Sequence, residues 1–368
     1  TAITATGMAV AGGALTVAAI NNSASPDYHG HTTYNDKEKN ERMKIAIIVA
    51  YFGTLPSYFQ VFLDSCRMNR NFDWLIFTND TTEYNYPSNV HQIVMSFNEC
   101  RQAVQKRFSF PVALKTPQKL CDYKCAYGYI FEDYLKDYDW WGHCDLDQIF
   151  GDLSVSVTED RLNTLDKIYS LGHLTLYRNT DVNNRIFMSE LNGETLYKNV
   201  FTSDRGMGFD EWLPGNINEI FLSKKVPALY KNDGADIEAY HMAFVLTDYD
   251  VAQRKYTHSS IRNSIFLWEK GKLYQLYIEH GELKRREFPY IHLQKRKMKD
   301  NRKLATSESF YIVPNCFVDG TEDPVALLKR SQIWTVINPQ YFKVKYQSLK
   351  YRLKSGDWIR RNVFKQSN

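Results

Sequence analysis

Residues 44–51 read KIAIIVAY, a short run of almost wholly apolar residues. A strand buried on both faces of a parallel sheet has this pattern, because neither of its faces meets water. Residues 56–68 follow with apolar side chains at helical spacing, and residues 74–78, WLIFT, resemble a second buried strand. The order of strand, helix and strand predicts the first unit of an α/β sheet.

The same alternation continues along the chain. Residues 90–95 predict a third strand, residues 120–134 a helix with one apolar face, and residues 139–143, DWWGH, a fourth strand. Further strands are expected at residues 167–170 and 174–178, and two-residue alternation over residues 264–294 predicts antiparallel strands with turns at Lys270-Gly271 and His280-Gly281. We therefore predict an α/β fold with a mixed, mostly parallel sheet flanked by helices.

The fourth strand runs directly into Cys144-Asp145-Leu146-Asp147. Side chains two residues apart on a strand point to the same face, and an open α/β sheet binds its ligands at the carboxyl ends of its strands. Two carboxylates placed there suit a hard cation such as Mg²⁺ or Mn²⁺, which in turn suits a nucleotide diphosphate. The motif is short, and a solvated acidic turn is the alternative interpretation.

Composition narrows the class of protein. The 368 residues are 43% apolar and 14% aromatic, enough for a sizeable core, so a disordered chain is not expected. The net charge of +4 says little about partners, and the basic residues lack an RNA or DNA module around them, so we expect no nucleic-acid partner. Six cysteines without paired CxxC spacing predict neither a disulfide scaffold nor a zinc site, which favours a cytoplasmic setting.

The first 42 residues differ from the rest in composition. Residues 8–20 are rich in Ala and Gly but are shorter than the roughly 20 residues that span a bilayer. They also lack the basic flank that a signal peptide has on its N-terminal side. We expect residues 1–42 to be a tag or flexible extension, residues 43–300 to form the main domain, and residues 301–368 a C-terminal extension.

Several segments together resemble one known family. They are WGHCDLDQIFGDL at 141–153, IVAYFGTLPSYFQVFLDSC at 48–66, PQKLCDYKCAYGYIF at 117–131, SLGHLTLYRNT at 170–180, GFDE at 208–211 and YIHLQKRKM at 290–298. In this order the segments resemble bacterial glycosyltransferases of the capsule and cell-surface polysaccharide type, over residues 43–298. The resemblance implies a GT-A fold, a nucleotide-sugar donor, a divalent metal and an acceptor on a growing glycan.

The resemblance also implies a metal site. Asp145 and Asp147 match the metal-binding pair, with Asp147 expected nearer the ion, and Asp145 also beside the donor. His292 matches a late histidine that completes the metal shell, although a polar residue on a strand would look the same. One of Lys295, Arg296 and Lys297 is expected to neutralise the diphosphate, the alternative being a solvated basic surface.

The nucleotide is expected at the ends of the first two strands. Tyr51, Phe52 and Gly53 match the place of base and ribose, where an aromatic ring stacks and a glycine permits close approach. Asp80 follows the second strand and is similar to a position that touches the nucleotide. The same resemblance implies nucleotide contacts for Lys119 and Asp122, although Lys119 has the alternative of an ordinary surface lysine.

An inverting transferase needs a carboxylate base to take the proton of the acceptor hydroxyl. Asp210 and Glu211, after the glycine-containing stretch 206–209, resemble that base motif, so we favour inversion. The alternatives are that both carboxylates bind acceptor hydroxyls or cap a helix. His173 is a further residue expected near the sugar, or else an ordinary core histidine.

Residues 343–365 carry eight basic residues against one acid, and their apolar residues fall near helical spacing. A basic amphipathic helix suits an anionic membrane surface, whereas a helix packed on the domain is the alternative. We therefore expect a cytoplasmic glycosyltransferase, peripheral at the inner face of the plasma membrane, that uses a nucleotide sugar, with a UDP-sugar favoured, and a glycan or lipid-linked acceptor. The main rival is a non-catalytic carbohydrate-binding protein with the same fold.

Overall fold

The structure is a computed structural model of the whole chain. It describes residues 43–350, with gaps at 240, 242, 295, 304–307, 338–341, 344 and 348, and for residues 333–337 it describes the backbone alone. The predicted extension over residues 1–42 and most of the predicted basic helix therefore lie outside the described residues. Residues 343, 345 and 350, which are lysines at the start of that helix, are exposed on helical backbone.

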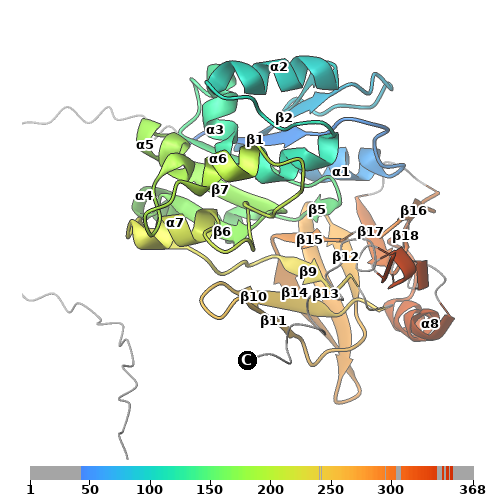
Figure 1. The fold of residues 1–368 in the computed structure, drawn as a ribbon. Helices are drawn as coiled ribbons and strands as arrows, with labels where there is room; N and C mark the ends of the chain where they lie inside the picture. The colour runs from blue at the N-terminus through green and yellow to red at the C-terminus, as the bar shows by residue number, and fades with distance from the viewer. Residues whose placement is uncertain are drawn as a thin grey trace, which may run out of the picture. The chain divides into compact units, whose positions relative to one another are not determined.

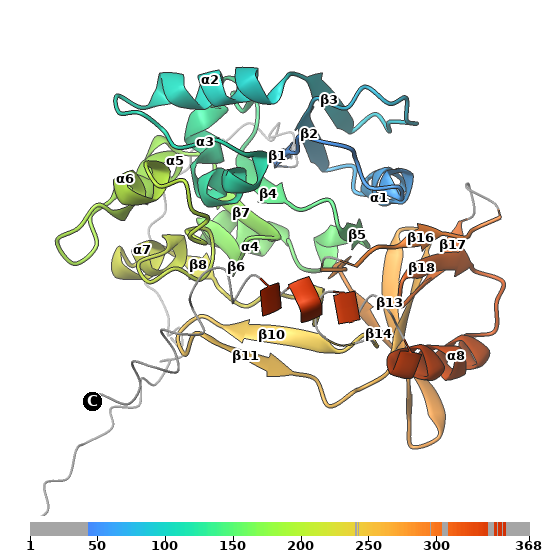
Figure 2. The same ribbon diagram turned by 45° about the vertical axis from the view of Figure 1, so that its right-hand side comes forward.

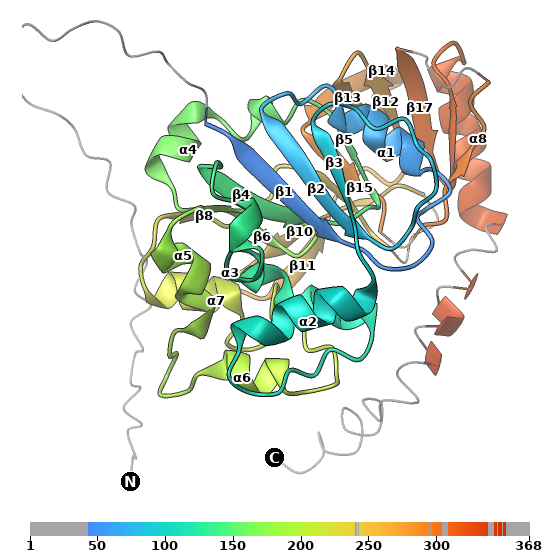
Figure 3. The same cartoon turned by 90° about the horizontal axis from the view of Figure 1, so that it is seen from above.

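The centre of the fold is a seven-stranded sheet in the order β3-β2-β1-β4-β7-β6-β8. Its strands are β1 (Ile45–Ala50), β2 (Phe72–Thr78), β3 (Val90–Val94), β4 (Trp140–Cys144), β6 (Lys167–Leu171), β7 (Leu174–Arg178) and β8 (Ala228–Leu229). Within this sheet only β7 runs against the others. Figure 3 shows β1, β2 and β3 side by side, and the prediction of a mixed, mostly parallel sheet is confirmed.

Helices cover both faces of this sheet (Figure 1). They are α1 (Phe59–Cys66), α2 (Phe97–Arg107), α3 (Tyr127–Ile130), α4 (Glu159–Thr164), α5 (Asp181–Arg185), α6 (Leu196–Phe201) and α7 (Ile217–Ser223). Successive side chains of β4 point to opposite faces of the sheet, and each face has its own hydrophobic core. Trp141 packs with residues of α2, α3, α6 and α7, while Trp140 packs with residues of α1 and α4. The α/β class predicted from the apolar runs is therefore confirmed.

A second sheet carries strands from distant parts of the chain. Its order is β11-β10-β9-β15-β5, formed by β5 (Gln148–Phe150), β9 (Ala235–Ile237), β10 (Leu246–Asp250), β11 (Lys255–His258) and β15 (Tyr290–His292). β15 pairs antiparallel with β5 and parallel with β9. This sheet therefore places residues near 147, 236 and 292 beside one another, and Figure 2 shows β10 and β11 running beneath the main sheet.

The third sheet is mainly antiparallel and contains most of the strands predicted for residues 264–294, whereas β15, at the end of that range, belongs to the second sheet. The third sheet consists of β12 (Ile265–Glu269), β13 (Lys272–Glu279), β14 (Glu282–Phe288), β16 (Lys299–Asp300), β17 (Ser309–Val313) and β18 (Cys316–Asp319), followed by α8 (Pro324–Ile337). Lys270-Gly271 and His280-Gly281 do form its turns, and all four residues have positive φ. The expected boundary at residue 300 falls inside this sheet, because β17 pairs with β12.

The segment predicted as a helix over residues 120–134 is largely a 3₁₀-helix. It begins with η1 (Pro117–Ala126) and continues through α3 to the short η2 (Glu132–Tyr134). In a 3₁₀-helix the side chains at i and i+3 eclipse one another, which sets Lys119 directly over Asp122. The part of the chain that the structure describes contains two more short 3₁₀ turns, η3 (Leu153–Val155) and η4 (Ile186–Met188).

The described residues include no helix that is both long enough and apolar enough to cross a bilayer.

A capping box at the start of α2 stabilises this helix. Ser96 caps α2 by accepting a hydrogen bond from the Glu99 backbone, and the Glu99 side chain returns to the Ser96 backbone. We expect Ser96→Ala to lower the free energy of unfolding by about 1 kcal/mol, measured by urea denaturation. Thr195→Ala is the control, because Thr195 at the start of α6 makes no capping hydrogen bond and its loss should have a smaller effect.

Candidate metal site

The acidic pair lies where the sequence predicts it, at the carboxyl end of β4. The Asp145 backbone N–H donates to the His173 carbonyl at 3.0 Å, which fixes the chain as it leaves the strand. Two residues later the Asp147 carbonyl accepts from Leu293 N–H at 2.7 Å, just after β15. These two contacts join the acidic segment to the β6–β7 turn on one side and to β15 on the other.

The pairing of β15 with β5 brings His292 to the acidic pair. Its Nε2 lies 3.3 Å from Asp147 Oδ1, and Asp145, Asp147 and His292 each offer one ligand atom within 4.8 Å of the others. Two ligand atoms of one ion are about 3 Å or slightly more apart, since each is about 2.0–2.3 Å from it. Two carboxylates and an imidazole at this spacing fit a divalent metal, so the three predicted ligands converge.

His292 is buried between two carboxylates. Burial alone would lower the pKa of its imidazole, but Asp147 on one side and Asp236 on the other outweigh burial and raise that pKa well above its usual value. Without a metal the ring is therefore held as a cation. A metal needs the neutral imidazole, so binding at this position releases a proton.

Lys124 is a member of the site that the sequence did not reveal. Its Nζ donates to Asp145 Oδ1 at 2.6 Å and to the Gly172 carbonyl at 2.8 Å. Burial by itself would lower the pKa of Lys124, but the nearby carboxylates of Asp145 and Asp210 outweigh it and raise that pKa. Asp145 thus already has a protein cation on one oxygen, which agrees with the expectation that Asp147 lies nearer the ion.

Gly172, in the turn between β6 and β7, joins the acidic pair to Asp210 and Glu211. Its N–H donates to Glu211 Oε2 at 2.9 Å, while its carbonyl accepts from Lys124. A Cβ at Gly172 would lie 2.2 Å from Asp210 Oδ2, so the carboxylate and the turn are in close contact. The two predicted catalytic carboxylates therefore lie next to the predicted metal ligands.

Asp210 and Glu211 differ in their surroundings. Asp210 is buried, and burial together with the charge of Glu211 raises its pKa well above the usual value. Burial also raises the pKa of Glu211, but the Gly172 N–H and Lys124 stabilise its charged form. The Gly172 N–H therefore favours the charged form at Glu211, which is also the more exposed of the two side chains.

Lys119 and Asp122 hold the loop that carries Asp210 and Glu211. Asp122 accepts from the backbone N–H groups of Met207, Gly208 and Phe209 and pairs with Lys119 at 2.7 Å. Lys119 Nζ also donates to the backbone carbonyl of Val200 in α6 and to that of Arg205 in the loop. With both side chains almost wholly buried, the structure gives them an anchoring role rather than the predicted contact with the nucleotide.

The loop after β1 carries Tyr51, whose hydroxyl donates to the Thr54 carbonyl at 3.2 Å. Burial and the charges of Asp147 and Asp80 raise the pKa of Tyr51. Gly53, at φ 129°, donates its N–H to Asn79 Oδ1 at 2.7 Å. Phe52 is buried against Phe97 at a centroid distance of 5.5 Å, which leaves Tyr51 as the partly exposed ring of the three predicted residues.

Asp80 serves this loop as an anchor. Its two carboxylate oxygens accept from the backbone N–H groups of Leu55 and Thr82 at 3.0 and 2.9 Å, and these hydrogen bonds lower its pKa. The side chain remains partly exposed beside Tyr51. Its position is therefore close to the expected nucleotide, although its hydrogen bonds go to the protein backbone.

The three basic residues after β15 are in different situations. Lys295 lies outside the described residues. Arg296 is buried and donates to the backbone carbonyls of His241 and Ala243 at 2.5 and 3.2 Å, so it supports the segment before β10 instead of facing a diphosphate. Lys297 is exposed.

His173 packs directly behind the metal ligands. Its ring stacks on His292 with centroids 4.2 Å apart, and its Nε2 lies 3.1 Å from the Tyr290 hydroxyl. Burial, reinforced by the charged His292, lowers the pKa of His173 to about 3, so this imidazole is neutral. It is near the site, as expected, but within the core.

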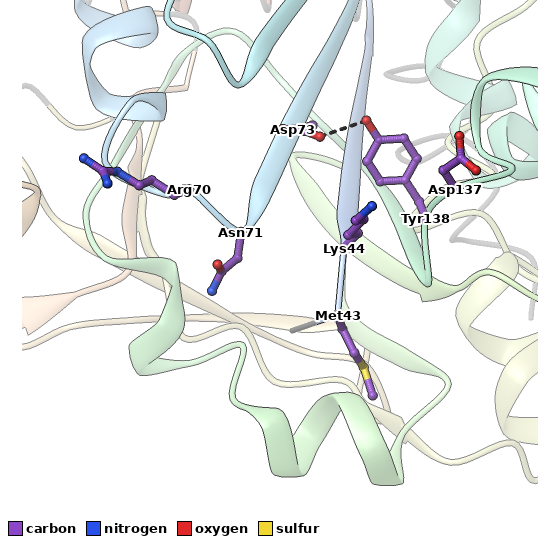
Figure 4. A pocket seen from close by; sticks show the side chains of 7 residues that line it. All are labelled: Met43, Lys44, Arg70, Asn71, Asp73, Asp137 and Tyr138. Atoms are coloured by element: carbon purple, nitrogen blue, oxygen red, sulfur yellow. Dashed lines mark hydrogen bonds between the residues drawn. The ribbon is translucent and has the colours of Figure 1, made fainter. Parts of the chain in front are cut away.

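A separate pocket of about 290 Å³ lies at the opposite edge of the main sheet (Figure 4). Lys44 and Asp73 mark the amino ends of β1 and β2 there, and the Tyr138 hydroxyl donates to Asp73 at 2.9 Å. Ligands of open α/β sheets bind at the carboxyl ends of the strands, where Asp145 and Asp147 lie. This pocket is therefore distinct from the candidate site.

The fold and site together define an α/β protein with a carboxylate and histidine cluster, suited to a divalent metal, at the strand ends of its main sheet. The chain belongs to a protein family of unknown function, DUF6625, which it matches over residues 47–321. No curated protein matches it. Among solved structures it is similar to the galactosyltransferase LgtC in complex with donor and acceptor sugar analogs, at 11% identity and a TM-score of 0.30, covering 52% of this chain and 75% of that one.

The anchoring role of Lys119 can be tested by stability. Lys119→Met would leave Asp122 charged and buried without its partner, so we expect a loss of about 3–5 kcal/mol in the free energy of unfolding, measured by urea denaturation. Lys115→Met is the matched control, because Lys115 pairs with Asp204 of the same loop but is largely exposed. It should cost less than about 1 kcal/mol. Equal losses in the two variants would contradict the anchoring role.

Proposed function

We propose that this protein is a metal-dependent glycosyltransferase that transfers a sugar from a nucleotide diphosphate donor. The observation that carries the proposal is the convergence of Asp145, Asp147 and His292 beside Asp210 and Glu211, at the carboxyl ends of the main sheet. One group of residues suits a metal and the other suits proton transfer. A sugar-transfer reaction with a diphosphate leaving group needs both.

Asp147 and His292 would hold the metal, with Asp145 as the third ligand. A bound Mg²⁺ or Mn²⁺ supplies positive charge to the diphosphate as it leaves. Lys124 adds a fixed cation next to Asp145, so the protein itself also lowers the negative charge of the site. The resemblance of the sequence to GT-A enzymes supports the same assignment.

Glu211 is the better candidate for the base. In an inverting transfer the acceptor hydroxyl oxygen attacks the anomeric carbon, the bond from that carbon to the phosphate oxygen breaks, and the hydroxyl proton passes to a carboxylate. Glu211 is partly exposed and stabilised as an anion, whereas Asp210 is buried with a raised pKa. We therefore assign the base to Glu211 and a protonated, supporting role to Asp210.

The finer parts of the proposal rest on sequence resemblance. We propose a UDP-sugar as donor, with Tyr51 beside the nucleotide base. The proposed acceptor is a glycan or lipid-linked glycan in surface polysaccharide synthesis. A cytoplasmic location, with the basic C-terminal residues at the inner face of the plasma membrane, would suit a lipid-linked acceptor.

The first test is a panel of nucleotide sugars with Mn²⁺. We expect one donor to be hydrolysed and to raise the melting temperature of wild type, and Asp147→Ala to abolish both effects because it removes a ligand. Asp145→Ala should also lose activity, since it removes a ligand and leaves Lys124 buried without its carboxylate. Both rates and melting temperatures are measured with and without EDTA.

Asp152→Ala is the control for this panel, because Asp152 follows the same segment but caps the short η3 instead of facing the cluster. It should hydrolyse the donor at the wild-type rate. If no donor has any effect on wild type, enzymatic transfer is wrong for this chain. Binding of glycans without turnover would then favour the rival, a carbohydrate-binding protein.

The assignment of the base predicts unequal effects of two isosteric variants. Glu211→Gln removes the charged carboxylate and should lower kcat by about 100-fold or more. Asp210→Asn replaces a neutral acid with a neutral amide, so kcat should fall clearly less in this variant than in Glu211→Gln. Donor hydrolysis rates and the thermal shift with donor separate catalysis from binding, and a fully active Glu211→Gln would rule this base out.

A further inference from the structure

Asp236 on β9 lies behind the metal cluster and has no role in the transfer described above. Parallel pairing of β9 with β15 sets it beside His292. Its Oδ1 accepts from His292 Nδ1 at 2.7 Å and from Gln294 Nε2 at 3.0 Å, and its Oδ2 accepts from the Thr247 hydroxyl at 3.0 Å. This buried carboxylate is therefore supplied with donors from three directions.

The two nitrogens of His292 stand at different distances from their carboxylate neighbours. The 2.7 Å between Nδ1 and Asp236 is a charge-assisted hydrogen-bond length and is shorter than the spacing of two ligands on one ion. The 3.3 Å between Nε2 and Asp147 fits two atoms that share an ion of about 2.0–2.3 Å bond length. Nδ1 is thus the protonated nitrogen and Nε2 the ligand.

We propose that Asp236 is the positioning residue of the metal site, holding His292 so that Nε2 faces Asp145 and Asp147. This inference rests on the metal site of the proposed function. A carboxylate that accepts the outer N–H of a ligating imidazole fixes its tautomer and ring orientation and makes the ligand nitrogen more basic. Asp236 acts through His292 and does not touch the ion.

The alternative is that Asp236 itself binds an ion with His173 and His292, since these three residues also lie close enough together. Three observations favour positioning. Donors from Thr247, Gln294 and His292 already occupy both oxygens of Asp236. His173 lies with its Nε2 against the Tyr290 hydroxyl and its ring stacked on His292. An ion there would have to break this set of contacts.

The test measures Mn²⁺ affinity by electron paramagnetic resonance, with the full chain and no sugar donor. Asp236→Asn keeps the size of the side chain but removes its charge, so we expect Mn²⁺ to bind about 10- to 100-fold more weakly. Asp248→Asn is the matched control, because it makes the same chemical change on β10 at an exposed carboxylate. It should bind Mn²⁺ within twofold of wild type.

The outcomes separate this inference from the proposed function. If wild type binds Mn²⁺ and Asp236→Asn binds it within twofold, positioning by Asp236 is wrong while the metal site stands. If wild type itself binds no Mn²⁺, the metal site fails and the inference fails with it. Melting temperatures without metal show whether each variant is folded.

A measurement on wild type keeps the inference testable even if Asp236→Asn does not fold. In Mg²⁺-bound protein labelled with ¹⁵N-histidine, the His292 signal, identified by its loss in His292→Gln, should show the proton on Nδ1. A proton on Nε2 would overturn the proposal, because that nitrogen could not then be the ligand.

Discussion

The contact on which the site depends is the one between the Lys124 ammonium, the Asp145 carboxylate and the Gly172 carbonyl. Four acidic residues gather in this region, at Asp145, Asp147, Asp210 and Glu211, and repulsion among those that are charged would oppose folding. A buried cation with direct hydrogen bonds to one carboxylate and to the turn beside the others offsets that repulsion. The same ion pair is what ties β4, the β6–β7 turn and the 3₁₀-helix η1 together.

The site is assembled from segments that lie far apart in the chain. The main sheet supplies the end of β4, and the second sheet carries β15 back from residue 290 to lie beside β5. The loop with Asp210 and Glu211 depends on a third connection, the buried pair of Lys119 and Asp122. Each link is a buried, directional contact, so the geometry of the site is set by the core of the protein instead of by flexible surface loops.

Much of the main sheet could be predicted, because KIAIIVAY and WLIFT are short apolar runs, rich in β-branched and aromatic residues, that are typical of strands covered on both faces. The position of Asp145 and Asp147 followed from the end of β4, and His292 from resemblance. Lys124 could not be found, because nothing in the sequence distinguishes a lysine that pairs with a buried carboxylate from an ordinary surface lysine, and only the structure shows it buried in η1. Asp236 lies on a three-residue strand, too short to show a period.

The turn at Gly172 has a consequence for how this sequence can vary. Its N–H donates to Glu211 and its carbonyl accepts from Lys124. Its Cα faces the carboxylate of Asp210. Even alanine would place a carbon 2.2 Å from an Asp210 carboxylate oxygen, so any side chain at position 172 requires that carboxylate to move. Changes of specificity in relatives of this chain should therefore arise in the surrounding loops rather than at this turn.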